Sequence, residues 1–264
     1  MQLLEIVRNL EGKSDHKRSE FIEQTLLRWG LSYEVHPYAT GRNILLPSGR
    51  PHWVGISSHF DAVRHSPGAN DNASAVAVCL DLIRRSQLKP LRNIGLGFFF
   101  FDEEEKHLKG SAAYVSQLGI HGMAGLINLE MVGQGDRLAL WSLNEKTKGR
   151  VLKTLETTAS AYAICTRRFD RIITNYADHM SFQQAGLAEA FSVTCISEKD
   201  IEVAYHYFKA QEFDVDKATL WEILSQAPLF QHYHQPTDVS SHLSEESLQM
   251  TAQVIWQTLL ALDR

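Results

Sequence analysis

The chain has only three cysteines among its 264 residues, Cys79, Cys165 and Cys195, and they are widely spaced. An odd number without a Cys-x-x-Cys pair argues against a disulfide framework and a cysteine zinc site, so we expect three reduced thiols in the core. A long apolar run is also lacking. The most apolar stretch, "NIGLGFFFF", is far shorter than the roughly 20 residues that span a bilayer, so we expect no membrane segment.

An excess of one charge is absent as well. The net charge is −5, and the 26 basic and 31 acidic residues are interspersed along the chain. Because no basic stripe is available to hold a phosphate backbone, we do not expect nucleic acid as a partner. The first 20 residues carry early charges and lack the apolar core of a signal peptide, which predicts a cytoplasmic protein. The sequence does not indicate an oligomeric state.

The chain has enough apolar residues, 44%, for a sizeable core, and no repeat or linker divides it, so we expect a single domain over residues 1–264. Apolar periodicity predicts helices over residues 15–29, 74–86, 148–162 and 244–264, the last with Ser244 as its N-cap. Strands are predicted over residues 31–36, 43–47, 52–59, 93–101, 125–132 and 138–142. This alternation predicts an α/β fold with a central mixed, mostly parallel β-sheet and helices on both faces, in three layers.

One segment joins the most apolar and the most acidic parts of the chain. Residues 98–111, "FFFFDEEEKHLKGS", place four phenylalanines directly before four acids. A continuous aromatic run indicates a strand buried on both faces, since a half-buried strand would alternate polar and apolar residues. The acids then lie at the carboxyl end of a strand, where α/β sheets bind ligands. Taken alone, a solvated acidic turn at the start of a helix is the simpler interpretation.

Three other segments place metal-ligand types beyond or beside apolar strands. In "GISSHFDAV", His59 ends a strand, and Asp61 could accept its second ring proton and so orient the imidazole for a metal. In "PGANDNASA", Asp71 lies in a turn-rich loop that opens a helix. In "GLINLEMVG", Glu130 would be an unpaired charge after an apolar strand, and a divalent cation is one of the few adequate partners. Each segment alone also fits an ordinary turn or hydrogen-bonded pair.

A last segment, "FQHYHQPTD", holds His232 and His234 in a loop, and either histidine could bind a metal or be solvated. Together the segments offer histidine and carboxylate groups in the numbers that a two-metal hydrolytic site requires. Two metals about 3.5–4 Å apart polarise a carbonyl and generate hydroxide together. The sequence therefore predicts a hydrolytic metal centre at the strand ends.

The order and spacing of these segments resemble metallopeptidase family 28, the co-catalytic zinc aminopeptidases, whose relatives include glutamate carboxypeptidase and glutaminyl cyclase. The family pattern appears here as "HFD", "GANDN", "EEKHLKGS", "NLEMVG" and "HQPTD", over nearly the whole chain. Aligning the later Leu-x-Gly-Ser places the family's Glu pair on Glu104 and Glu105 and leaves Asp102 and Glu103 outside it. Neighbouring acids can differ in role because side chains at a strand end point in different directions.

The resemblance implies two zinc ions held by five side chains: His59, Asp71, Glu105, Glu130 and His234. Asp71 would bridge the two ions. Glu104 would be the general base that takes a proton from the attacking water and returns it to the leaving amine. Asp61 would support catalysis by orienting His59. The segment "YADHMSF" also matches a family element, which implies that Asp178 lies near the site and contacts substrate.

The chain departs from the family pattern at three positions. His107 replaces the usual Gly, and Ala75 stands where a Gly often follows "AS". Glu130 occupies a position where Asp is commoner, which keeps the carboxylate but lengthens its reach. Neither of the first two changes involves a predicted ligand.

These observations predict a zinc-dependent exopeptidase, an aminopeptidase that removes the N-terminal residue from a peptide or small aminoacyl substrate by metal-activated water. A glutaminyl-peptide cyclotransferase with one zinc is the nearest alternative, because the same positions recur in that relative. An alternative of another class is a non-catalytic binding protein on the same fold. That alternative predicts lost ligands, and none of the five is lost.

Overall fold

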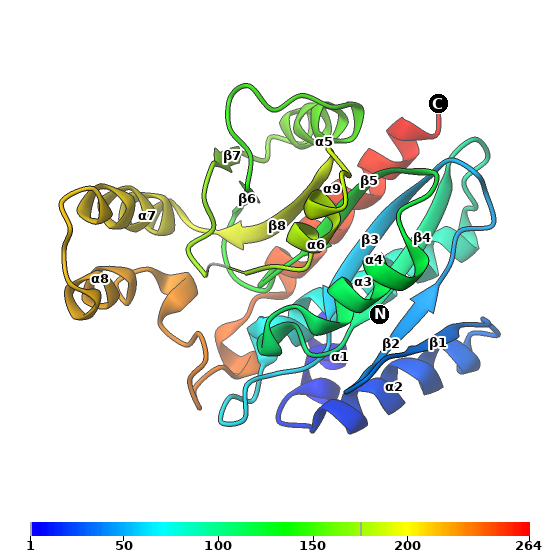
Figure 1. Cartoon of the computed structure of the whole chain (residues 1–264), viewed down its shortest axis with the longest axis horizontal. Coiled ribbons are helices and arrows are strands. Elements are labelled where there is room, and N and C mark those ends of the chain that lie inside the picture. The colour runs from blue at the N-terminus through cyan, green and yellow to red at the C-terminus, as the bar shows by residue number, and fades with distance from the viewer. Residues whose placement is uncertain (1, 175) are drawn as a thin grey trace.

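The computed structural model describes residues 2–174 and 176–264. Within them one mixed sheet runs through the molecule in the order β1-β2-β4-β3-β5-β8-β6-β7 (Figure 1). The strands are β1 Glu34–Pro37, β2 Arg42–Leu46, β3 Trp53–His59, β4 Gly95–Phe101, β5 Met123–Leu129, β6 Arg137–Trp141, β7 Thr166–Phe169 and β8 Ala190–Ile196. The central strands β4, β3, β5 and β8 pair in parallel, whereas β1, β2 and β6 add antiparallel pairs. The predicted mixed, mostly parallel sheet is therefore confirmed.

Helices cover both faces of this sheet. They are α1 Leu3–Leu10, α2 Asp15–Arg28, α3 Ala75–Leu88, α4 Lys109–Leu118, α5 Arg150–Ala161, α6 His179–Gln184, α7 Glu198–Gln211, α8 Lys217–Leu224 and α9 Glu245–Leu262. One face is covered by α1, α3, α5 and α9, which contact one another, and the same core includes Ile22 and Leu26 of α2. The opposite face is covered by α4 and α6. This arrangement confirms the predicted three layers.

The phenylalanine run forms β4 at the centre of these layers. Phe98 and Phe100 pack into the core beneath α3 and α9, whereas Phe99 and Phe101 pack on the other face against Tyr114 of α4. All four are at most 3% exposed. Burying an aromatic side chain stabilises a fold by about 1.5–3 kcal/mol, so the end of β4 is firmly held in place. The acids that follow β4 are therefore held close to its carboxyl end.

The element boundaries differ from the predicted ones mainly at the ends of strands. The strand predicted over residues 31–36 begins only at Glu34, and β5 ends at Leu129, three residues before the predicted end. The predicted N-cap is confirmed, because the Ser244 hydroxyl accepts a hydrogen bond from the Ser247 amide. The prediction of three core cysteines is wrong for Cys165, which is exposed because it lies in the turn between α5 and β7.

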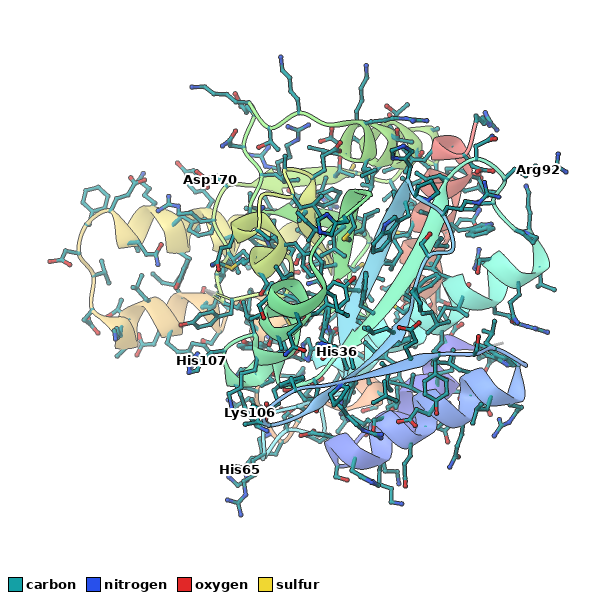
Figure 2. All side chains as sticks on the ribbon, turned by 45° about the vertical axis from the view of Figure 1, so that its right-hand side comes forward. His36, His65, Arg92, Lys106, His107 and Asp170 are labelled. Atoms are coloured by element: carbon teal, nitrogen blue, oxygen red, sulfur yellow. The ribbon has the colours of Figure 1, made fainter. Side chains whose placement is uncertain are left out.

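A helical hairpin that the sequence analysis did not predict, α7 with α8, projects from the rest of the chain (Figures 1 and 2). Its base joins a separate apolar cluster in which Val203 and Leu224 accompany Trp141 and Phe230. The hairpin therefore stands beside the end of the sheet near β6. Over the described residues, no helix combines the length and apolar character needed to cross a membrane.

Candidate metal centre

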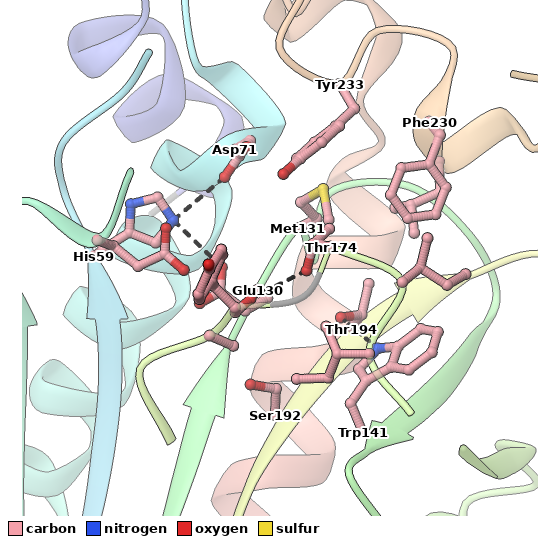
Figure 3. A pocket seen from close by; sticks show the side chains of 16 residues that line it. His59, Asp71, Glu130, Met131, Trp141, Thr174, Ser192, Thr194, Phe230 and Tyr233 are labelled. Carbon is pink, nitrogen blue, oxygen red and sulfur yellow. Dashed lines mark hydrogen bonds and ion pairs between the residues drawn. The ribbon is translucent and has the colours of Figure 1, made fainter. Parts of the chain in front are cut away.

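The predicted ligands meet at the carboxyl edge of the central parallel strands. His59 is the last residue of β3, and Glu130 directly follows β5. Asp71 lies in the short helical turn Ala69–Ser74 before α3, at a point where the backbone departs from helical angles. Glu105 lies in a turn after β4, and His234 comes from the loop that precedes α9. Figure 3 shows His59, Asp71 and Glu130 converging on one cavity.

The donor atoms form two groups that share Asp71. In one group, the His59 Nε2 atom lies 3.3 Å from Asp71 Oδ1 and 3.4 Å from Glu130 Oε2. In the other, the His234 Nε2 atom lies 3.2 Å from Asp71 Oδ2 and 3.1 Å from Glu105 Oε2. Asp71 thus presents one carboxylate oxygen to each group. This is the arrangement expected of a bridging ligand.

The distances fit a tetrahedral metal better than hydrogen bonds alone. One Nε2 proton cannot be donated with good geometry to two carboxylates at once, yet the Nε2 atoms of His59 and His234 each face two. Two ligand atoms about 2.0–2.1 Å from a tetrahedral zinc ion lie about 3.4 Å apart. The donor–donor distances of both groups are close to that value. Imidazole and carboxylate donors also suit zinc, so the residues present fit this metal.

The electrostatics show why a cation is needed at this place. Burial, with the charge of Glu130, holds the pKa of Glu104 well above its usual value. Burial and the charge of Asp71 raise the pKa of Glu105 to about 7. Burial would lower the pKa of His234, but its hydrogen bonds to Asp71 and Glu105 raise that pKa to about 10. The metal-free cluster therefore retains protons, which bound cations would replace.

Asp61 supports the metal centre without lining its cavity. The His59 Nδ1 atom, on the side of the ring away from the donor group, lies 3.2 Å from one carboxylate oxygen of Asp61 and 3.2 Å from its backbone carbonyl oxygen. The same carboxylate accepts the backbone N–H groups of Glu104 and Glu105, each at 3.1 Å. Asp61 is 1% exposed and is not among the described residues that line the cavity. It is therefore a positioning residue that acts through the histidine and the acidic turn.

Side-chain amides and a second aspartate hold the other carboxylates. Glu130 accepts hydrogen bonds from Asn72 Nδ2 and from Asn128 Nδ2, both at 2.8 Å. Asp238 accepts the backbone N–H of Asp71 at 3.1 Å. Outer partners of this kind typically orient ligands and tune their affinity for a metal. The longer reach of Glu130 is thus fixed by two donors.

Arg18 of α2 is a further support that the sequence analysis missed. Its guanidinium is 1% exposed and donates to the backbone carbonyls of Phe60 at 3.2 Å, Pro67 at 2.6 Å and Gly68 at 3.0 Å. These bonds join the segment after β3 to the segment that leads to Asp71. In the sequence, Arg18 sits on the charged side of an amphipathic helix and resembles an ordinary solvated residue.

The first two acids of the acidic run, Asp102 and Glu103, do not join the metal centre. The Asp102 carboxylate accepts the backbone N–H groups of Arg42 at 3.2 Å and Glu103 at 2.9 Å. Glu103 pairs with Lys106 at 3.0 Å and with Lys109 at 3.8 Å. Both carboxylates therefore have partners of their own, whereas Glu104 and Glu105 lie near the histidines of the metal centre.

The turn after these acids explains one departure from the family pattern. His107 and the following Leu108 have φ angles of 69° and 58°, in the left-handed region that glycine adopts most readily. The His107 ring makes an edge contact with Tyr176, at 5.3 Å between ring centroids. A glycine at this position would relieve the backbone but lose that contact.

The metal centre opens into a small cavity. Most of its other lining residues are apolar or aromatic, namely Met131, Trp141, Ile172, Ile173, Tyr176, Ala177, Leu229, Phe230 and Tyr233, and Thr174, Ser192 and Thr194 are polar. The Tyr233 hydroxyl points toward the space beside Asp71 and Glu130 (Figure 3), and its ring stacks on His234 with centroids 3.8 Å apart. Burial and the nearby Asp71 raise the pKa of Tyr233, so the phenol stays a hydrogen-bond donor. The sequence analysis did not identify Tyr233 as a site residue. The only available signal was its place in the sequence, directly before the predicted ligand His234.

Asp178 and His232 lie outside the two donor groups. Asp178 is fully buried, and neither of its carboxylate oxygens has a hydrogen-bond partner among the described residues. Burial raises its pKa to about 8. It is not among the described residues that line the cavity, and its contact with substrate stays a prediction. His232 bonds to Thr237 and stacks on His242, so His234 is the histidine of this loop that joins the centre.

A mixed α/β sheet that carries two histidine–carboxylate groups around one shared aspartate is typical of two-metal hydrolases. The sequence places the protein more narrowly. Residues 44–259 match peptidase family M28, and the chain belongs to that family.

Named relatives support this placement. The aminopeptidase YwaD of Bacillus subtilis (strain 168) is 28% identical over 209 residues, which are 78% of this chain and 40% of the relative. The solved structure of BSAP, a zinc aminopeptidase from Bacillus subtilis, has a TM-score of 0.62 at 23% identity, over 84% of this chain and 50% of that one. Porphyromonas gingivalis glutaminyl cyclase has a TM-score of 0.73 at 16% identity, over 99% and 97% of the two chains. The chain spans less than half the length of the first curated relatives that it matches.

Proposed function

We propose that the protein is a zinc-dependent aminopeptidase that removes an apolar N-terminal residue from peptides. The observation that carries this proposal is the pair of histidine–carboxylate groups around Asp71, with Glu104 beside them in the cavity wall. Two zinc ions bound there would polarise the scissile carbonyl and acidify the attacking water. His59 and Glu130 would hold one ion, His234 and Glu105 the other.

The remaining chemistry falls to side chains of the cavity. Glu104 is 9% exposed and lines the cavity, which places it to take a proton from the attacking water and return it to the leaving amine. The Tyr233 hydroxyl would donate a hydrogen bond to the oxygen on which charge develops. The apolar walls around Met131 and Trp141 would receive the first side chain of the substrate.

A glutaminyl-peptide cyclotransferase with one zinc is the second candidate. The near-complete overlap with the fold of the Porphyromonas gingivalis enzyme, over 97% of that chain, favours it. The intact group of His59 and Glu130, with donor atoms 3.4 Å apart, instead supports a second metal and therefore the aminopeptidase. A non-catalytic binding protein is disfavoured because all five predicted ligands are present and converge. Cytoplasmic location stays a prediction from the sequence.

The decisive experiment compares the four neighbouring acids by hydrolysis of leucinamide and by zinc content. Glu104→Gln keeps its shape but cannot accept a proton, so we expect full zinc and a kcat lower by about 10²-fold or more. Glu105→Gln should lose zinc from one group. Asp102→Asn and Glu103→Gln are matched controls with their own partners, and both should retain zinc and most activity. Zinc loss in Glu104→Gln with full zinc in Glu105→Gln would contradict the assignment of both roles.

The reaction class is tested separately with zinc-loaded wild-type chain. Leucinamide hydrolysis is measured beside cyclisation of an N-terminal glutaminyl peptide, with Glu104→Gln as the control for contaminating peptidase. We expect hydrolysis without cyclisation, and close to two zinc ions per chain. Cyclisation, together with one zinc ion whose binding is unchanged by Glu130→Ala, would establish the second candidate instead.

A further inference from the structure

A second cavity adjoins the one at the metal centre. It has a volume of about 430 Å³ and lies between α8 and residues 173–174, and we call it the outer groove. The two cavities share four lining residues: Ile173, Thr174, Phe230 and Tyr233. On the far side, the outer groove is walled by Leu220 and Trp221 of α8. Helix α8 of the projecting hairpin thus forms one wall of a groove that continues from the metal-centre cavity.

The two cavities differ in how they end. One end of the metal-centre cavity is buried, since Met131 and Trp141 are each 6% exposed and Thr194 is 2% exposed, whereas Tyr176, in another part of its lining, is 48% exposed. The walls of the outer groove reach the surface, since Trp221 is 46% exposed and Lys217 is exposed. An aminopeptidase needs a closed end for the first residue and an open path for the rest of the peptide. The outer groove therefore lies on the side of the residues that follow the scissile bond.

We infer that the outer groove binds the side chain of the residue directly after the scissile bond and selects apolar side chains there. This inference rests on the proposed aminopeptidase function. Apolar side chains line part of the groove, beside the polar Thr174, Gln211 and Lys217, and an apolar substrate side chain would remove them from water: Ile173, Leu220, Trp221, Leu224 and Phe230. No ion pair between Lys217, at the groove rim, and a carboxylate is present in the described parts of the chain. The rim can therefore accept the free carboxylate of a dipeptide.

The test compares Leu-Phe with Leu-Gly, two dipeptides that differ only in the second side chain, on the zinc-loaded chain. We expect the wild type to favour Leu-Phe by about tenfold in kcat/KM, the lower end of what an apolar pocket contributes to discrimination. Trp221→Ala should reduce this ratio toward one, and Trp221→Phe should restore most of it. Melting curves verify that each variant is folded.

Phe213→Ala is the matched control. Phe213 is an aromatic residue of the same hairpin, 71% exposed, and it lines neither cavity. We expect this variant to keep the wild-type ratio. A wild-type ratio near one, or an equal loss in Phe213→Ala and Trp221→Ala, would overturn the outer groove as a subsite while leaving the aminopeptidase intact. A wild type that fails to hydrolyse leucinamide would overturn the proposed function, and the inference with it.

Discussion

Removal of metal should make the stability of this chain fall as the pH rises from 6.5 to 8. The reason lies in buried carboxyl groups near the metal centre. Burial raises the folded-state pKa of Asp178 to about 8 and that of Glu105 to about 7. A carboxyl with a raised pKa keeps in the folded state a proton that it loses in the unfolded chain. Its contribution to stability is complete below the unfolded pKa and disappears as the pH rises through the folded value.

The size of the effect follows from these two values. Between pH 6.5 and 8, Asp178 and Glu105 together would lose about 2 kcal/mol, at about 1.4 kcal/mol per pKa unit. His234, with a pKa raised to about 10, changes in the same direction because its proton is also kept in the folded chain. His179, whose pKa burial lowers to about 3, acts oppositely but mostly below pH 6.5. A fall of about 2 kcal/mol corresponds to about 4–8 °C in melting temperature for a domain of this size.

The assay is thermal and chemical unfolding of EDTA-treated and zinc-loaded chain at constant ionic strength, in half-unit steps of pH. The metal-free chain should lose stability steadily across this range. Zinc-loaded chain should not, because deprotonated ligands bind zinc more tightly and binding stabilises the folded state. Asp178→Asn is the internal control, and its metal-free form should show a clearly smaller decline. Metal-free stability that stays constant or rises from pH 6.5 to 8 would refute the reasoning.

Three further substitutions test the supports of the centre. Asp61→Asn should weaken zinc affinity by about 10–100-fold without unfolding the chain, and wild-type affinity in a zinc titration would exclude its orienting role. Arg18→Met should lower stability by about 3 kcal/mol and weaken zinc binding, because three backbone carbonyls lose a buried donor. Partial recovery of zinc affinity in Arg18→Lys is expected, and wild-type affinity in Arg18→Met would contradict the link between the two loops. Glu130→Asp should shorten the reach to its group and reduce zinc stoichiometry from two toward one, whereas full occupancy by elemental analysis would show that the reach is not limiting.

The sequence predicted the parts of the site that depend on local pattern. Phe98 to Phe101 form an unbroken aromatic run, which leaves little alternative to a strand buried on both faces, and the acids must then follow at its end. His59 and Glu130 likewise come directly at or after apolar strands. Since parallel strands end at a common edge, these positions alone bring the side chains close together. The family motifs then indicated which of these residues to expect as ligands.

The parts that escaped prediction depend on contacts between distant segments. Arg18 reaches carbonyls 42 to 50 residues away, and nothing in its own helix distinguishes it from a solvated arginine. The outer groove requires α8 to pack beside residues 173–174, which no local periodicity can show. Tyr233 becomes notable only when its hydroxyl is seen to face the metal centre. Each of these features is a property of the tertiary arrangement.

The different positions of Glu104 and Glu105, to which we assign different roles, have another cause than the one expected from strand geometry. Alternation along a strand would direct adjacent side chains to opposite faces, but β4 ends at Phe101, and Glu104 and Glu105 lie in a separate helical turn. Their backbone N–H groups are held by the two carboxylate oxygens of Asp61, each at 3.1 Å, and the residue before them, Glu103, has a φ angle of 54° that turns the chain. The positions of Glu104 and Glu105 are therefore set relative to Asp61, which also contacts His59. A substitution that moves this one carboxylate should disturb base and ligand together, even though neither side chain is altered.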